Sequence, residues 1–338
     1  MNQVEGGVRE SIMQPNHHQR LVAEDLHKTY GPREALRGLS FSLNAGRILG
    51  FLGPNGAGKT TSIRILTTIL EPDKGHFVVD GTSSKYPEKI RRKIGVLPEN
   101  LGLPKQITGI EYLTYFGQLY GRTRADARTY GLSLLEEVGL RQRARSLVGT
   151  YSHGMRQRLG IARALVNDPV VVFLDEPTLG LDPRGQQELL SLIQRIARER
   201  NSSIVLCSHV LPEIESVCDD VIILLEGQII ATGSVEEVMK RAQRNAVRVR
   251  VPSPSVAEAQ QVLEAIPNVT GVTYSVEKAG WMGVQFENST EEAASERFHA
   301  NNMILGALIR AEIPVLSFES EGGRLQDVFL QLTEEASK

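Results

Sequence analysis

The feature that most restricts the fold of this chain is a glycine-rich stretch that ends in Lys-Thr-Thr. It matches the pattern Gly-x-x-x-x-Gly-Lys-Ser/Thr in full, over Gly53, Pro54, Asn55, Gly56, Ala57, Gly58, Lys59, Thr60 and Thr61. An apolar run at 48–52 precedes the stretch, and apolar residues at near-helical spacing follow it through residue 70. Between a strand and a helix, such glycines let backbone amides surround a phosphate at the helix N-terminus. We therefore expect a phosphate-binding loop rather than a glycine turn without function.

Two pairs of polar residues predict the chemistry around that loop. In a phosphate loop, Lys59 reaches the β- and γ-phosphates and Thr60 offers a hydroxyl to Mg²⁺. Farther along, an apolar run at 170–174 ends in Asp175 and Glu176. We expect Asp175 to hold Mg²⁺ through water, and Glu176 to orient the attacking water and accept its proton. Carboxylates also end strands as simple helix caps, but their place after a phosphate loop favours the catalytic interpretation.

Length and composition exclude several other classes. The 338 residues are enough for two domains, and the net charge of −2 gives no support for a surface that binds nucleic acid. No apolar run approaches the roughly 18 residues that span a bilayer. Residues 1–19 are polar without a secretory segment, and we predict a flexible tail. The two cysteines, Cys207 and Cys218, show no metal or disulfide pattern, which fits a reducing cytoplasm.

The order of expected elements predicts an α/β nucleotide-binding domain over residues 20–242. Two antiparallel strands, 21–29 and 35–43, come before the phosphate loop, and strands alternating with helices after it indicate a mostly parallel sheet. A helical insert spans about residues 100–165. Its first helix opens with a Thr-x-x-Glu capping box at residues 108–111.

Residues 243–338 form a predicted accessory C-terminal domain. Its pattern is β-α-β-β-α-β followed by a helix, which indicates a small ferredoxin-like α+β fold. The expected elements are strand 244–251, helix 255–266, strands 269–276 and 280–286, helix 291–310, strand 315–318 and helix 325–332.

Four further motifs carry a resemblance to a known family. Residues 151–158, Tyr-Ser-His-Gly-Met-Arg-Gln-Arg, look like a Leu-Ser-Gly-Gly-Gln signature. Residues 179–182 look like the D-loop that follows Asp-Glu-Pro-Thr, His209 falls at the switch histidine after the next strand, and Tyr30 falls at the adenine-stacking aromatic. Over about residues 20–240 the sequence closely resembles the ATP-binding subunits of ABC transporters, which are P-loop NTPases with an antiparallel β subdomain and a helical insert.

The resemblance implies how these motifs act on ATP and Mg²⁺. Ser152 and the amide of Gly154 would contact the γ-phosphate held by a second copy of the chain, so that two ATP molecules are sandwiched in a dimer. Asp182 would belong to the nucleotide site as part of the D-loop. His209 would hydrogen-bond the γ-phosphate, and Tyr30 would stack on adenine; the alternatives are a structural loop histidine and a core aromatic.

Three residues depart from the family pattern. His153 replaces the first signature glycine, while Ser152 and Gly154 remain, and Tyr151 replaces the usual leucine. Glu99 stands where the family has a glutamine that touches Mg²⁺ and the attacking water. A carboxylate also suits Mg²⁺, so we expect Glu99 to be a metal ligand; the alternative is a solvent-facing loop glutamate.

The resemblance also implies partners and a place in the cell. The residues that follow the signature and the C-terminal run at 325–333 look like the ATPases of bacterial exporters whose permease subunits are separate integral-membrane chains. This implies a peripheral position on the cytoplasmic face of the cell membrane and no nucleic-acid partner. The alternatives are an importer ATPase and a soluble ABC ATPase that acts on nucleic acid or ribosomes. The C-terminal domain is either a dimer contact or a spacer.

Overall fold

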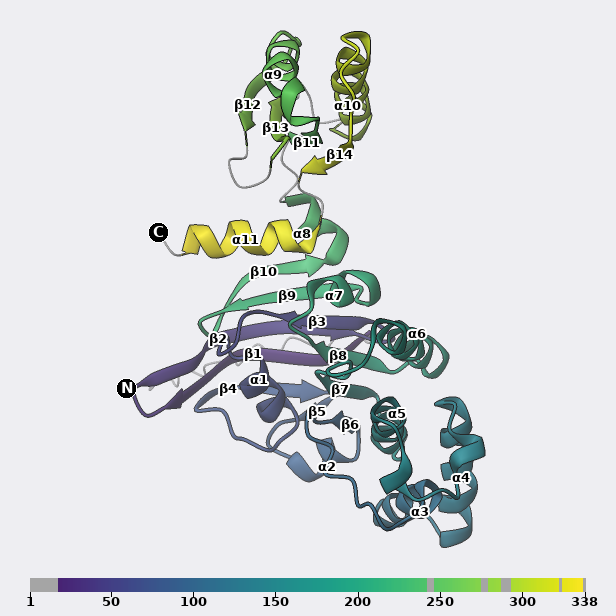
Figure 1. Cartoon of the computed structure of the whole chain (residues 1–338). Helices are drawn as coiled ribbons and strands as arrows, with labels where there is room; N and C mark the ends of the chain where they lie inside the picture. The colour runs from purple at the N-terminus through teal and green to yellow at the C-terminus, as the bar shows by residue number, and fades with distance from the viewer. Residues whose placement is uncertain (1–17, 242–245, 275–278, 287–292, 322–323, 337–338) are drawn as a thin grey trace, which may run out of the picture. The chain divides into compact units, whose positions relative to one another are not determined.

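The computed structural model (Figure 1) describes residues 18–241, 246–274, 279–286, 293–321 and 324–336. The chain divides into two compact units at the junction of Thr232 and Gly233. The helix α8 (Val235–Arg241) lies within the first domain as predicted, residues 20–242, but belongs to the second unit of the structure. The predicted N-terminal tail lies outside the described residues, except for its last two.

An antiparallel sheet forms the first part of the first unit, as the sequence predicts. Its strands, in the order β2-β1-β4-β5, are β1 (Gln19–Tyr30), β2 (Arg33–Asn44), β4 (Lys74–Val79) and β5 (Thr82–Ser83). Apolar side chains from these strands, Leu21 and Leu39 among them, are buried in one core. The last pair of the β1–β2 ladder joins Tyr30 to Arg33, so the hairpin brings these two side chains to one end.

The second sheet positions the site, because its neighbouring strands end at the same edge. Its order is β10-β9-β3-β8-β7-β6, and the pairs β9–β3, β3–β8, β8–β7 and β7–β6 are parallel. The strands are β3 (Ile48–Leu52), β6 (Ile94–Leu97), β7 (Val171–Asp175), β8 (Ser203–Cys207), β9 (Asp220–Leu225) and β10 (Gln228–Ser234). Because β3, β8 and β7 are neighbours, the loops after them leave from adjacent carboxyl ends, where ligands bind in open α/β sheets.

Helices complete the first unit (Figure 1). They are α1 (Lys59–Leu66), α2 (Pro87–Arg91), α3 (Gly109–Leu119), α4 (Arg124–Glu137), α5 (His153–Ala164), α6 (Pro183–Arg200) and α7 (Leu211–Val217), with short 3₁₀ turns η1 (Arg141–Arg143) and η2 (Val148–Thr150). On α1, Ile63, Ile65 and Leu66 share one core with side chains from both sheets. This packing fixes the position of α1, which begins where the glycine-rich loop ends.

The predicted helical insert consists of α3, α4, both 3₁₀ turns and α5. Figure 1 shows α3 and α4 side by side in this insert, and the first of them opens with the predicted capping box. The Thr108 hydroxyl accepts from the Glu111 N–H at 3.3 Å, and the Glu111 carboxylate accepts from the Thr108 N–H at 2.8 Å. Among the described residues, no helix has the length and apolar content needed to cross a membrane.

The second unit has its own antiparallel sheet, in the order β12-β13-β11-β14. Its elements after α8 are β11 (Ala246–Arg250), η3 (Ser253–Ser255), α9 (Val256–Glu264), β12 (Val269–Tyr274), β13 (Trp281–Phe286), α10 (Ala293–Arg310), β14 (Ser317–Glu321) and α11 (Leu325–Ala336). This is the β-α-β-β-α-β order that the sequence predicts. A separate apolar core, which includes Val249, Leu263 and Met282, holds the unit together.

Both cysteines of the chain lie inside the first unit. Cys207 ends β8 with no exposed surface, and Cys218 follows α7 with 9% exposure. Both thiols are free, and burial raises the pKa of each well above its usual value. They therefore act as small apolar side chains rather than as reactive or metal-binding groups.

Candidate nucleotide site

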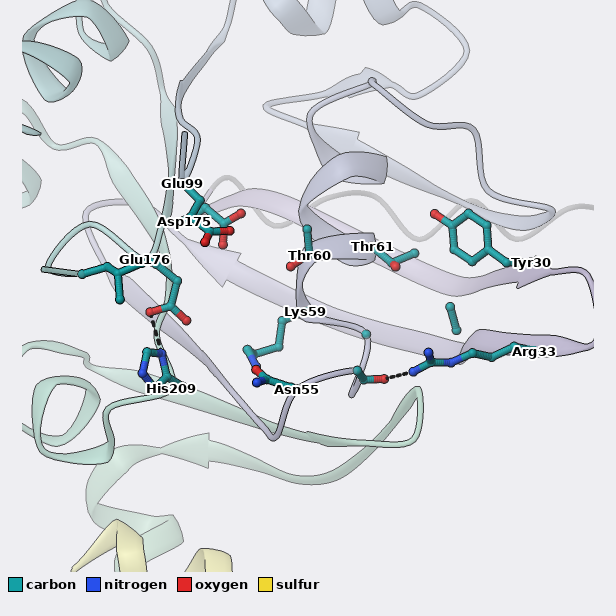
Figure 2. A pocket seen from close by; sticks show the side chains of 14 residues that line it. Tyr30, Arg33, Asn55, Lys59, Thr60, Thr61, Glu99, Asp175, Glu176 and His209 are labelled. Atoms are coloured by element: carbon teal, nitrogen blue, oxygen red, sulfur yellow. Dashed lines mark hydrogen bonds and ion pairs between the residues drawn. The ribbon is translucent and has the colours of Figure 1, made fainter. Parts of the chain in front are cut away.

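A cavity of about 570 Å³ opens where the β1–β2 hairpin, the glycine-rich loop and the carboxyl ends of the parallel strands meet. Figure 2 shows Tyr30 and Arg33 at one end of it, and Glu99, Asp175, Glu176 and His209 at the other. The residues that line it are Tyr30, Arg33, Ala35, Asn55, Gly56, Gly58, Lys59, Thr60, Thr61, Glu99, Asp175, Glu176, Leu179 and His209. A long ligand therefore meets an aromatic ring at one end and carboxylates at the other.

The loop between β3 and α1 takes a path that requires glycine at two positions. Gly58 caps the N-terminus of α1 at φ 110°, and a Cβ there would lie 2.7 Å from the Ala35 carbonyl oxygen. A Cβ on Gly53 would lie 2.3 Å from the carbonyl oxygen of Leu224. Both distances are too short for any other residue, because the opposing atoms are backbone. The motif thus lets the loop pack against neighbouring backbone while the start of α1 faces the cavity.

Two cations are bonded to the carbonyl oxygens of this loop. Lys59 is 8% exposed, and its ammonium group donates to the Gly53 oxygen at 2.6 Å and to the Pro54 oxygen at 3.1 Å. The Arg33 guanidinium donates to the Gly56 oxygen at 2.8 Å (Figure 2). Together with the partial positive charge at the start of α1, they make this part of the cavity suited to phosphate.

At the far end, a carboxylate and an imidazole face each other. His209 Nδ1 lies 2.9 Å from Glu176 Oε2 (Figure 2), and since a carboxylate oxygen only accepts, Nδ1 carries the hydrogen. The Glu176 side chain is 15% exposed and that of His209 is 53% exposed. Glu176 has φ +48°, a left-handed conformation that is costly for a residue with a side chain and is common at functional sites. The pair has the arrangement of an oriented proton acceptor.

Asp175 and Glu99 add carboxylate oxygens at the same end of the cavity as this pair. Burial raises the pKa of Asp175 from 3.8 to about 6, with smaller contributions from the charges of Glu176 and Glu99, while Lys59 opposes the shift. Thr60 lines the same cavity, so its hydroxyl and three carboxylates border a common space. This all-oxygen set suits Mg²⁺, which takes one or two carboxylates together with phosphate oxygens and waters. Among the described residues, no three His, Cys, Asp or Glu side chains are grouped to hold a metal between them.

Six of the predicted site residues do not line this cavity: Gly53, Pro54 and Ala57 of the glycine-rich loop, and Ser152, Gly154 and Asp182. Ser152 caps α5, where its hydroxyl accepts from the Met155 N–H at 3.3 Å, and Gly154 lies in the first turn of that helix. Asp182 caps α6 by accepting from the Gly185 N–H at 3.0 Å. Ser152, Gly154 and Asp182 thus lie at helix N-termini outside the cavity.

The two signature departures each make a specific contact. Nε2 of His153 lies 2.8 Å from the Leu179 carbonyl oxygen and so donates to it, which joins the start of α5 to the loop before α6. The Tyr151 ring is buried, and its hydroxyl donates to the Arg143 carbonyl oxygen at 2.7 Å. Both substitutions therefore add a hydrogen bond that glycine or leucine lacks.

The structure brings most of the predicted residues together and adds three. The predicted residues that line the cavity are Tyr30, Asn55, Gly56, Gly58, Lys59, Thr60, Thr61, Glu99, Asp175, Glu176 and His209. Arg33, Ala35 and Leu179 also line it and were not predicted. For Arg33 the signal was available, because it follows Tyr30 across a Gly-Pro turn and must lie near it in a hairpin.

Comparisons with known proteins give a consistent result. The family model described as ABC transporter matches residues 36–179. The linearmycin resistance ATP-binding protein LnrL of Bacillus subtilis (strain 168) is 30% identical over 93% of this chain and 98% of its own length. The daunorubicin/doxorubicin resistance ATP-binding protein DrrA of Streptomyces peucetius is 34% identical over 91% of this chain and 90% of its own. The solved structure of cbiO1 from Clostridium perfringens, part of the ABC transporter complex cbiONQ, is 27% identical with a TM-score of 0.62, over 66% of this chain and 91% of that one.

Proposed function

The chain belongs to the ABC transporter family, and on that premise we propose how its cavity acts and what it works with. It is an ATP-binding and ATP-hydrolysing subunit of a transporter of the drug and antibiotic exporter type. The observation that carries the proposed mechanism is that one cavity joins Lys59 and Thr60 to the Glu176–His209 pair.

In the proposed mechanism the nucleotide lies along the cavity. Tyr30 stacks on adenine, the glycine-rich loop surrounds the phosphates, and Lys59 exchanges its carbonyl partners for β- and γ-phosphate oxygens. Glu176 orients a water toward the γ-phosphate and accepts its proton, while His209 fixes the carboxylate and reaches the γ-phosphate.

We assign the metal site to Thr60, Asp175 and Glu99, all of which line the cavity. Bound there, Mg²⁺ would neutralise charge on the phosphates. The raised pKa of Asp175 supports this assignment, because burial and, to a smaller extent, the charges of Glu176 and Glu99 disfavour its ionised form, which a divalent cation would stabilise.

Two partners complete the proposal. Ser152, Gly154 and Asp182 lie at helix N-termini outside the cavity, where they serve the nucleotide of a second copy in an ATP-sandwich dimer. Closing and reopening of this dimer would move separate permease subunits at the cytoplasmic face of the membrane. A permease partner is supported by cbiO1, which is part of a transporter complex, and export is supported by LnrL and DrrA, which are resistance proteins.

The test is the size of purified Glu176→Gln protein by light scattering, with and without Mg-ATP. The substitution keeps the residues that bind nucleotide and removes the proton acceptor, so we expect ATP to convert monomer to dimer. Lys59→Ala in the same background is the control and should stay monomeric. A Glu176→Gln chain that binds ATP and remains monomeric would contradict dimer closure by nucleotide alone.

A further inference from the structure

The helix α7 carries a buried carboxylate that does not line the nucleotide cavity. Glu213 is 5% exposed, and its Oε2 accepts from the Thr178 hydroxyl at 2.8 Å and from the Ser208 hydroxyl at 2.9 Å. Its other oxygen, Oε1, is buried and has no hydrogen-bond partner in the described part of the chain. A carboxylate buried with one oxygen unpaired costs stability. Packing alone therefore does not explain Glu213.

The two hydroxyls belong to the two loops that hold the Glu176–His209 pair. Thr178 comes two residues after Glu176, and Ser208 comes directly before His209. Both are almost fully buried, with 2% exposure for Thr178 and none for Ser208. A single oxygen atom of Glu213 therefore joins the loop after β7 to the loop after β8.

The loop after β7 needs such support, because Glu176 is held there in a costly conformation. A residue at φ +48° keeps it only when surrounding contacts determine it. The Glu176 N–H donates to the Cys207 carbonyl oxygen at 3.0 Å, which joins the loops through their backbones. Ser208 Oγ also accepts from the Val210 N–H at 3.0 Å, so its hydroxyl has a fixed direction. Glu213 adds a buried side-chain link between the same loops.

We propose that Glu213 is a positioning residue for ATP hydrolysis: by accepting from Thr178 and Ser208 through one oxygen, it fixes the geometry of Glu176 and His209. The inference rests on the proposed function, since it requires Glu176 to act as the proton acceptor. Glu213 acts through a hydrogen-bond acceptor and does not touch the nucleotide, because it lies outside the cavity.

Two substitutions of Glu213 distinguish a hydrogen-bonding role from a role of its negative charge. If the charge mattered, both would have the same effect on kcat, because both remove it. Glu213→Leu removes the acceptor, whereas Glu213→Gln keeps a carbonyl oxygen with two lone pairs that can accept from both hydroxyls. In steady-state ATP hydrolysis by the full chain, we expect Glu213→Leu to lower kcat about 10- to 100-fold, the scale of a slight misplacement of reacting groups. The KM for ATP should stay within about threefold of wild type, and Glu213→Gln should keep kcat within the same range.

Substitutions of the two hydroxyl residues, together with a matched control, test the hydrogen bonds to Glu213 one at a time. Thr178→Val and Ser208→Ala each remove one of the two bonds and should each lower kcat by less than Glu213→Leu does. In the Glu213→Leu background neither should lower it further, since the three residues act as a unit. Glu199→Leu makes the same change at an exposed position of α6 and should leave kcat near wild type. These variants decide the question even if Glu213→Leu does not fold.

Several outcomes would overturn the inference. The first is a wild-type kcat in folded Glu213→Leu, or in both Thr178→Val and Ser208→Ala. The second is a Glu213→Gln variant as slow as Glu213→Leu. The third is a Glu213→Leu variant whose KM for ATP rises while its kcat does not fall. A wild-type chain that neither binds nor hydrolyses ATP would instead overturn the proposed function, so the two failures are distinguishable.

Discussion

At the level of single residues, the partly buried carboxylate of Asp175 lowers the stability of the folded chain. Its pKa in the folded chain is about 6, against 3.8 without the surrounding structure. Between those values the folded state binds more protons than the unfolded state, so stability falls as pH rises through this window. Above about pH 6 the folded chain carries the full cost of a charged Asp175.

We expect Asp175→Asn to stabilise the chain at pH 7 in EDTA without nucleotide. The shift corresponds to about 3 kcal/mol, and partial exposure reduces this to about 1 kcal/mol, or about 2–4 °C in Tm. At pH 4 the wild-type side chain is largely neutral, so the two proteins should melt together. Thermal melts at both pH values make the comparison, and an equal difference at pH 4 and pH 7 would contradict the assigned cause.

The residue scale also shows where prediction from sequence succeeds. The glycine-rich loop, Asp175 and Glu176 are set by local sequence, because a loop and the strand before it are contiguous. The Gly-Pro turn places Arg33 near Tyr30, but the bond from Arg33 to Gly56 spans 23 residues and exists only after the β1–β2 hairpin has packed on the loop. Glu213 was missed because its bond to Thr178 spans 35 residues.

At the scale of elements, Tyr151 holds the start of α5 to the rest of the helical insert. Its ring is 3% exposed and its hydroxyl donates to the Arg143 carbonyl oxygen, which also accepts from the Ser146 N–H at 2.9 Å. A Cβ on Gly109, the first residue of α3, would lie 2.5 Å from the Tyr151 hydroxyl oxygen. Tyrosine at this position therefore fits because α3 begins with glycine.

Tyr151→Phe should lower the free energy of unfolding by about 0.5–1 kcal/mol, because the carbonyl loses one of its two donors and keeps the other. Denaturant unfolding of the purified chain measures the change. Tyr115→Phe is the matched control, since that ring is 58% exposed, and it should have no measurable effect. Equal effects of the two substitutions would show that the buried hydrogen bond contributes nothing.

Element order was predictable, whereas the arrangement of the elements was only partly so. Alternating strands and helices predicted an α/β fold, and the capping box at Thr108 was predicted from four residues. The order β10-β9-β3-β8-β7-β6 depends on pairings between strands far apart in sequence, which local patterns do not contain. The same long-range order decides that the loops after β3, β7 and β8 meet.

At the scale of the whole molecule, the two units have separate apolar cores. The cavity is built entirely from residues of the first unit. A ligand that binds only the folded state stabilises the unit that holds its site. Nucleotide should therefore act on one unit of the chain and leave the other unchanged.

Calorimetry of the Glu176→Gln chain tests this. We expect two transitions, and Mg-ATP at about 100 times its Kd should raise one of them by about 5–10 °C, since such binding adds about 2.7 kcal/mol. The other transition should stay in place. A single transition, or two that move together, would show that the units unfold as one.

The burial of Cys207 and Cys218 has a practical consequence for all of these measurements. The chain has two cysteines, one without exposed surface and one at 9% exposure. A thiol-directed dye therefore reacts slowly with the native protein, so a cysteine introduced on the surface becomes the preferred labelling position without prior removal of the natural ones. Fluorophore pairs attached in this way can follow the approach of two copies in real time, and labelling of the natural thiols reports the moment the first unit opens.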